Sequence, residues 1–147
     1  MDLTKTFPRS AKAKFAGLNM LGRTTDKARA FNAGTLGEYH YNCGMDQKAF
    51  ALLGIDHETY AKKVAELKDD AAIERWVKDA FLKAKTEAEI DAYNKTIEEL
   101  HPEAGSEGEK YFLELRDTVA PGRTDVTTWP DLLDLDEHRQ VPIRIAA

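Results

Sequence analysis

Two helix-start signatures in the second half of this chain constrain its fold more than any other feature. Thr86-x-x-Glu89 and Ser106-x-x-Glu109 each place a hydroxyl residue three positions before a glutamate. In this capping box each side chain satisfies an unpaired backbone N–H of the first helical turn. Apolar residues follow both boxes at helical spacing, and His101-Pro102 and Pro121-Gly122 end the two runs. We therefore expect two helices here.

The same helical period extends through most of the preceding chain. It predicts a helix from Ser10 toward Leu21, which Gly22-Arg23-Thr24 interrupts, and a short helix that Thr25 or Asp26 caps and Gly34 ends. Three further helices are predicted to begin near Asp46, after Asp56 and after Asp69-Asp70, the first of them closed by Gly54, and a last one begins at Thr128.

The sequence as a whole predicts one compact all-α domain over residues 1–147, with about six or seven helices. An extended tail follows from Gln140, in which Val141, Ile143 and Ile145 alternate with other residues. A length of 147 residues is typical of a single domain.

Charge and composition exclude several classes of protein. The net charge of −5 argues against a general nucleic-acid binder, which would carry a clustered basic surface. No apolar run approaches membrane-spanning length, and the first ten residues lack the apolar segment of a secretory signal. A single cysteine forms no intramolecular disulfide. We expect a cytoplasmic protein without nucleic-acid or membrane partners.

The main irregular segment is residues 34–47, which we call the central loop. It gathers the one cysteine, one of four histidines, two tyrosines, two carboxylates and three glycines, and loops with such side chains carry function when a scaffold fixes them. One interpretation is a binding surface for a small polar ligand or a protein partner. The tyrosine rings would stack on the ligand and the polar side chains would hydrogen-bond to its polar edge. The candidate ligand-binding residues are Glu38, Tyr39, Tyr41, Asn42, Asp46, Gln47 and Arg123.

A second interpretation is catalysis by Cys43. A thiolate nucleophile needs a nearby base or positive field, which His40 or the start of the helix near Asp46 could supply. Glu38, His40 and Asp46 could instead act as acid–base groups or metal ligands, completed by His57 or His101. The spacings typical of metal sites are absent from the sequence, so no metal is predicted and no cofactor is identified.

Two charged segments outside the loop have competing interpretations. Arg123 lies in a polar stretch and could bind a carboxylate or phosphate, or the stretch could be a simple connection. Asp26, Lys27 and Arg29 precede the central loop, and Arg29 could hold it through Glu38 or Asp46. The commoner explanation for such charges is a solvated helix face.

Three stretches together resemble a known family: residues 2–10, the run Asp26-Lys27-Ala28-Arg29-Ala30 leading into residues 34–43, and residues 123–129. The whole chain is similar to an uncharacterised family of small bacterial proteins, classed as a domain of unknown function. In that family the residues after the cysteine usually run Pro-Leu-Asp-Gln, and here they are Gly44-Met45-Asp46-Gln47. The resemblance implies a bacterial cytosolic protein and brings no activity, substrate or catalytic residue.

Three functions therefore remain open from the sequence. The first is a helical domain that binds a small polar molecule or a protein through the central loop. The second is an enzyme that uses Cys43, or the group Glu38, His40 and Asp46. The third is a structural homodimer in which the loop is packing and the tail pairs with a neighbouring chain.

Overall fold

A computed structural model describes residues 1–143 of the chain. Within them lie seven α-helices and one short 3₁₀ turn, η1 (Leu82–Ala84), and no β-strand. The all-α class and the expected number of helices are thereby confirmed, and none of these helices is long and apolar enough to cross a membrane. The helices are α1 (Leu21–Ala33), α2 (Gly44–Leu53), α3 (His57–Leu67), α4 (Asp70–Ala80), α5 (Glu87–Glu98), α6 (Glu107–Val119) and α7 (Trp129–Asp136).

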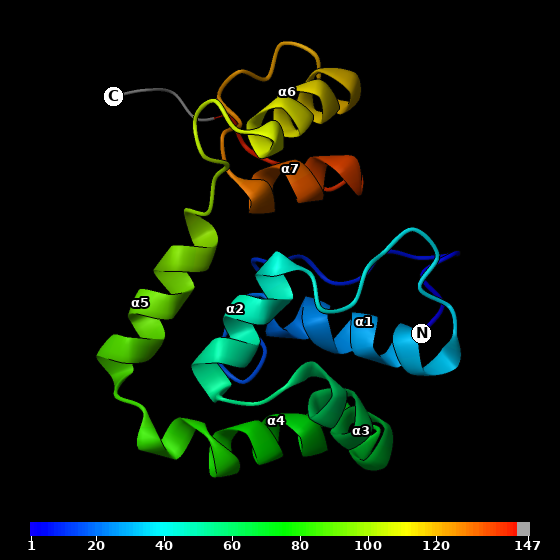
Figure 1. Ribbon diagram of the computed structural model, residues 1–147, viewed down its shortest axis with the longest axis vertical. Helices are drawn as coiled ribbons and strands as arrows, with labels where there is room; N and C mark the ends of the chain where they lie inside the picture. Colours follow the sequence, from blue (N-terminus) through cyan, green and yellow to red (C-terminus); the bar gives the residue numbers. More distant parts are fainter. Residues whose placement is uncertain (144–147) are drawn as a thin grey trace. The chain divides into compact units, whose positions relative to one another are not determined.

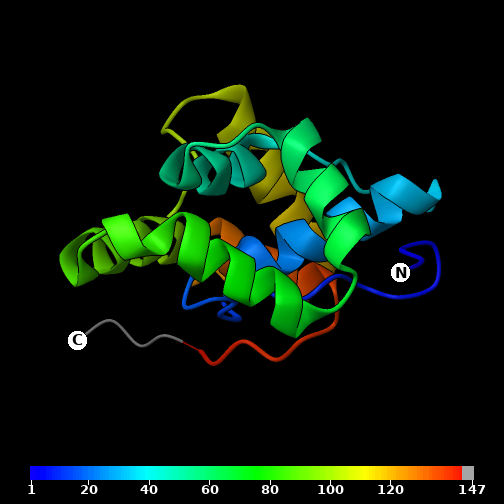
Figure 2. The same cartoon turned by 90° about the horizontal axis from the view of Figure 1, so that it is seen from below.

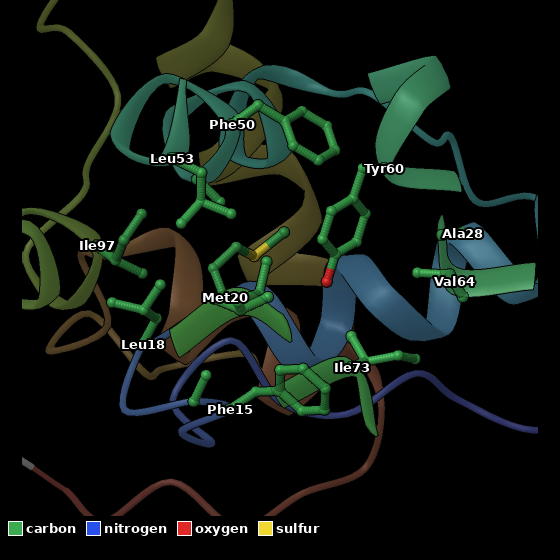
Figure 3. Close-up of a cluster of buried hydrophobic side chains, with 14 of the residues drawn as sticks. Phe15, Leu18, Met20, Ala28, Phe50, Leu53, Tyr60, Val64, Ile73 and Ile97 are labelled. Carbon is green, nitrogen blue, oxygen red and sulfur yellow. The ribbon is translucent and has the colours of Figure 1, made fainter. Parts of the chain in front are cut away.

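The chain divides into two compact units, Met1–Ile97 and the remainder from Glu98. In the first unit, α1 lies between α2 and the α3–α4 pair (Figures 1 and 2). Burial of apolar side chains around α1 stabilises this unit. Figure 3 shows the cluster that they form, in which Tyr60 directs its hydroxyl toward α1. Its labelled members are Phe15, Leu18, Met20, Ala28, Phe50, Leu53, Tyr60, Val64, Ile73 and Ile97.

The prediction of a helix from Ser10 to Leu21 is wrong. Residues 10–20 form successive turns, in which Phe15 and Leu18 exchange two backbone hydrogen bonds of 2.9 Å. Ala16 and Met20 have φ values of 54° and 73°, which interrupt a helical path. Phe15, Leu18 and Leu21, the apolar residues of the expected helix, are nevertheless buried. Their spacing therefore predicted burial correctly but secondary structure incorrectly.

Side chains from α5 hold this turn segment in place. Asn94 Oδ1 accepts the N–H of Asn19 at 2.9 Å, and Asn94 Nδ2 donates to the carbonyl of Gly17 at 3.0 Å. The Tyr93 hydroxyl donates to the carbonyl of Asn19 at 2.9 Å. Because the partners lie more than 70 positions away in the chain, local sequence alone could not reveal them.

The expected break at Gly22-Arg23-Thr24 and the cap at Thr25 or Asp26 are also wrong. These residues lie inside α1, which begins at Leu21. The Thr25 hydroxyl donates to the carbonyl of Leu21 at 2.7 Å, within the helix, and lies 2.7 Å from the Tyr60 hydroxyl. Gly34 ends α1 as predicted, with a left-handed φ of 71°.

The other predicted helix starts are confirmed. Asp56 accepts the N–H of Thr59 at 2.7 Å, and Asp69 accepts that of Ala72 at 2.8 Å. Thr86 and Ser106 each accept the N–H of the residue three positions later, at 3.1 Å. The helix expected from Asp46 begins two residues earlier, at Gly44, and ends at Gly54 as predicted.

The second unit contains α6, α7 and the chain around them. Phe112, Val126 and Leu132 form its buried cluster, and the rings of Phe112 and Trp129 meet edge to face at 5.0 Å. The predicted tail has no regular structure over residues 140–143: Val141 is buried, whereas Ile143 is 69% exposed. Ile145 lies outside the described residues.

Candidate functional site

Helix α1 buries charged residues as well as apolar ones. Asp26 is only 2% exposed and Lys27 only 3%, so the interpretation of these residues as a solvated helix face is wrong. Charged groups are rarely buried without partners, because removing them from water costs several kcal/mol each. Their partners lie on other elements and define the candidate site.

Lys27 pairs with Asp46, the third residue of α2. Lys27 Nζ lies 2.7 Å from Asp46 Oδ2, with 4% and 0% of the two side chains exposed. Asp46 Oδ1 accepts the Thr24 hydroxyl at 2.6 Å, and Oδ2 also accepts the N–H of Cys43 at 3.1 Å. Both carboxylate oxygens therefore have partners, which a buried charge requires.

The thiol of Cys43 completes this arrangement. Cys43 is half-buried at the N-cap of α2, and its Sγ accepts a hydrogen bond from Lys27 Nζ at 3.3 Å. We call Thr24, Lys27, Cys43 and Asp46 the thiol site. It places the sulfur of Cys43 beside a cation and at a helix N-terminus, with a carboxylate that fixes the position of the cation.

Neither Lys27 nor Thr24 was predicted as a site residue. No spacing rule connects them to Cys43, because α1 and α2 approach each other only in the folded chain. The one signal in the sequence was the run from Asp26 to Ala30, which belongs to the stretches that carry the family resemblance.

Of the groups predicted to act beside the thiol, the helix N-terminus and Asp46 do lie at Cys43, whereas the histidine and the glutamate are at the surface. His40 and Glu38 are exposed, and Lys27 Nζ donates a hydrogen bond to Cys43 Sγ. Among residues 1–143 no group of three histidine, cysteine or carboxylate side chains is arranged to hold a metal ion. The structure therefore brings together Cys43 and Asp46, and does not join Glu38, His40 and Asp46 into a metal centre.

Tyr41 is a packing residue of the central loop. Its hydroxyl donates to the carbonyl of His57 at 2.7 Å, and its ring lies 5.2 Å from that of Phe31 and 5.9 Å from that of Phe50. Burial raises the pKa of Tyr41 above its usual range. Tyr41 thus anchors the loop to α2 and to the start of α3.

The other predicted ligand residues lie nearer the surface. Tyr39 is half-buried beneath the guanidinium of Arg23, which lies 5.5 Å from its ring centroid. Gln47 is exposed, and its Nε2 donates to the carbonyl of Asn42 at 3.1 Å. Asn42 has a left-handed φ of 69°, which asparagine tolerates better than most residues.

The first residues of the chain fix the start of the central loop. The N–H of Leu3 donates to the carbonyl of Thr35 at 2.9 Å, and the Thr35 hydroxyl donates to the carbonyl of Met1 at 2.7 Å. A Cβ at Gly37 would lie 3.3 Å from the Leu3 carbonyl oxygen, and Gly37 has a φ of 61°. Loop and chain start therefore form one packed layer.

Arg29 does not bind Glu38 or Asp46. Its Nη2 donates to Asp70 Oδ1 at 2.8 Å and its Nη1 lies 3.5 Å from Asp26 Oδ1. Arg9 binds the same two carboxylates, at 3.0 Å to Asp26 and 2.9 Å to Asp70. This four-residue network joins the start of the chain, α1 and α4, and holds α1 without touching the thiol.

Arg123 belongs to the second unit. Its Nε and Nη2 donate to the two carboxylate oxygens of Asp125 at 2.9 and 3.0 Å, and Nη2 also donates to the carbonyl of Pro142 at 3.3 Å. Hydrogen bonding to Asp125 raises the pKa of the Arg123 guanidinium above its usual value. In this arrangement the guanidinium closes a turn.

The fold and the thiol site define a class: small all-α proteins in which a buried lysine–aspartate pair on the first two helices supports a half-buried cysteine. The sequence model of the family described as "Domain of unknown function (DUF5069)" matches residues 5–139. The chain belongs to this family, as its resemblance indicated. No curated protein matches the chain.

Proposed function

We propose that this protein is an enzyme that uses Cys43 as a nucleophile toward an activated acyl group. One observation carries the proposal: Lys27 Nζ lies 3.3 Å from Cys43 Sγ while Asp46 holds that ammonium at 2.7 Å. A nucleophile, a group that activates it and a third group that orients the second are the usual components of covalent catalysis.

Each residue of the thiol site has a role in such a reaction. The Cys43 thiolate attacks the acyl carbon, and the leaving group departs with a proton from Lys27. Water then hydrolyses the thioester, and its proton restores the Lys27 ammonium beside the thiolate. Asp46 keeps Lys27 in position throughout. Cys43 is the N-cap of α2, so the first backbone N–H groups of that helix, at Gly44 and Met45, are candidates to stabilise the developing oxyanion.

A binding function for the central loop is the second candidate. Here the supporting observation is that the loop is fixed at its start by Leu3 and in its middle by Tyr41, while Glu38, His40 and Gln47 are exposed. A rigid loop that presents polar side chains suits recognition of a small polar molecule or a protein. In the enzyme, the same side chains would select the substrate.

A cytoplasmic location is part of the proposal. The chemistry needs Cys43 as a reduced thiol, and reducing compartments maintain thiols in that state. The origin in bacteria that the family resemblance implies is compatible with this location.

The proposal is tested with p-nitrophenyl acetate, an activated ester that reports acylation as a burst of p-nitrophenolate. We expect one equivalent of burst per chain and one acetyl group on the peptide that contains Cys43. Cys43→Ser and the double variant Lys27→Met/Asp46→Asn, which removes both buried charges, should each lower the burst rate at least tenfold. His40→Ala should retain it.

A burst rate equal to that of free cysteine, or one unchanged in the double variant, would overturn the nucleophile proposal. Circular dichroism of each variant establishes that the fold is kept. If His40→Ala instead removes the burst, His40 rather than Lys27 activates the thiol.

A further inference from the structure

We infer that the thiol site is also a modification site, at which peroxide links Cys43 and Lys27 through a reversible covalent sulfur–nitrogen bond. The inference rests on the pairing of two nucleophilic atoms that belong to different helical segments. It does not depend on the proposed catalysis, since the bond would form in a protein with no substrate.

The geometry brings the two atoms within reacting distance. Lys27 Nζ and Cys43 Sγ are 3.3 Å apart, inside the range of about 3–3.5 Å typical of reactants poised for attack. Asp46 at 2.7 Å and the burial of Lys27 confine the nitrogen to this position. Cys43 is only half-buried, which suits access by a molecule as small as hydrogen peroxide.

The reaction proceeds in two balanced steps. Hydrogen peroxide first oxidises the Cys43 thiol to a sulfenic acid and is itself reduced to water. The Lys27 amine, after transfer of its proton to Asp46, then attacks the sulfur. The S–N bond forms, the S–O bond breaks, and hydroxide leaves as a second water with the proton from Asp46. The linked nitrogen then releases its remaining extra proton to solvent, which leaves a neutral sulfur–nitrogen bond. The linked chain is lighter than the reduced chain by two hydrogen atoms.

The consequence is a redox-controlled closure of the site. The link joins α1 to the start of α2, occupies the nucleophile and removes the positive charge that faced Asp46. Thiol reductants cleave sulfur–nitrogen bonds of this kind by attack on sulfur, which restores the original pair. Cys43 is also kept from irreversible oxidation to the sulfinic and sulfonic acids.

The test treats the full chain with hydrogen peroxide, blocks remaining thiols and analyses tryptic peptides by mass spectrometry. Peptide analysis is needed because the three methionines also take up oxygen. We expect a linked species joining residues 24–29 to residues 30–48, lighter than the two peptides together by two hydrogen atoms, with trypsin cleavage after Lys27 lost. Dithiothreitol should abolish this species.

Lys27→Arg is the matched control, because arginine keeps the charge beside Asp46 and lacks a nucleophilic amine. In this variant we expect Cys43 to proceed to sulfinic acid, with at least tenfold less linked species. A wild-type chain that gives only sulfinic acid with cleavage after Lys27 intact would overturn the inference. A link heavier than expected by one oxygen atom would contradict a direct sulfur–nitrogen bond. Neither of these two results would change the expected burst with p-nitrophenyl acetate, so the two proposals can fail separately.

Discussion

Lys27 Nζ donates a hydrogen bond to Cys43 Sγ at 3.3 Å, although the two residues are 16 positions apart in the chain. The same ammonium contacts Asp46 at 2.7 Å. One cation therefore contacts both a carboxylate that positions it and the sulfur of Cys43. Substitutions can separate the structural part of this arrangement from its chemical part.

The first prediction concerns the buried ion pair. Lys27→Met leaves Asp46 charged, buried and without its cation, and such an unpaired charge costs about 3–5 kcal/mol of stability. Lys27→Met/Asp46→Asn should recover most of that loss, because the amide oxygen still accepts from Cys43 N–H. Urea unfolding measures the free energy of unfolding of the single and the double variant. A double variant as unstable as the single one would show that the ion pair itself stabilises the fold.

The second prediction concerns the close approach of Arg9 to α1. A Cβ at Gly22 would lie 3.3 Å from Arg9 Nε and 3.4 Å from Phe15 Cβ. Arg9 cannot shift easily, because Asp26 and Asp70 both hold it. Gly22→Ala should therefore lower stability by about 1–3 kcal/mol, despite the better helix propensity of alanine.

Gly44→Ala is the control for that substitution. Gly44 also lies in a helix, and a Cβ there meets nothing within 4 Å, so its stability should change by no more than about 0.5 kcal/mol. Equal effects at Gly22 and Gly44, measured by thermal and urea unfolding, would contradict the packing assigned to Arg9.

The third prediction separates an anchor of the central loop from its surface. Tyr41→Phe removes the 2.7 Å hydrogen bond to the His57 carbonyl and should cost about 1 kcal/mol. His40→Ala removes an exposed ring and should change stability by less than about 0.5 kcal/mol. The opposite ranking in urea unfolding would mean that His40, not Tyr41, fixes the loop.

The fourth prediction is a pH dependence at Asp70. Burial alone would raise the pKa of this carboxyl, but hydrogen bonds from Arg29 and Arg9 outweigh it and hold the pKa below its usual value. The folded state therefore binds the Asp70 proton less readily than the unfolded state does. The resulting stability is present above the unfolded value of about 3.9 and is lost as pH falls through the folded pKa.

Asp70→Asn tests this directly. The wild-type chain should exceed the variant in stability near neutral pH, and the difference should shrink as the solution is acidified through that window. A difference that is independent of pH would contradict a depressed pKa at Asp70, since an uncharged amide has no proton to bind. Chemical unfolding at a series of pH values gives the difference.

Sequence patterns predicted the helices wherever the signal is local. Asp56, Asp69, Thr86 and Ser106 cap helices through bonds that span three residues, so a short window contains both partners. Turn residues 10–20 were misread as helix because Asn94, a distant partner, stabilises them. Hydrogen bonds between residues so far apart in the chain produce no recurring pattern of residue types in the sequence.

The same distinction between local and long-range contacts applies to the candidate site. Cys43 and Asp46 share the first turn of α2, and their proximity followed from their spacing. The place of Lys27 in the site did not follow from the sequence. The pattern of charges alone does not distinguish a solvated lysine from one that pairs with a buried carboxylate. His40, adjacent in sequence, is exposed instead. Proximity in the chain suggested His40 beside the thiol, whereas the contact with Lys27 arises only in the fold.

Activation of Cys43 by Lys27 is measured by the rate at which iodoacetamide alkylates Cys43 in the native protein near neutral pH. We expect Lys27→Met/Asp46→Asn, shown by circular dichroism to be folded, to react at least tenfold more slowly than the wild type. We expect His40→Ala to react at the wild-type rate. Equal rates for wild type and double variant would contradict activation of Cys43 by Lys27.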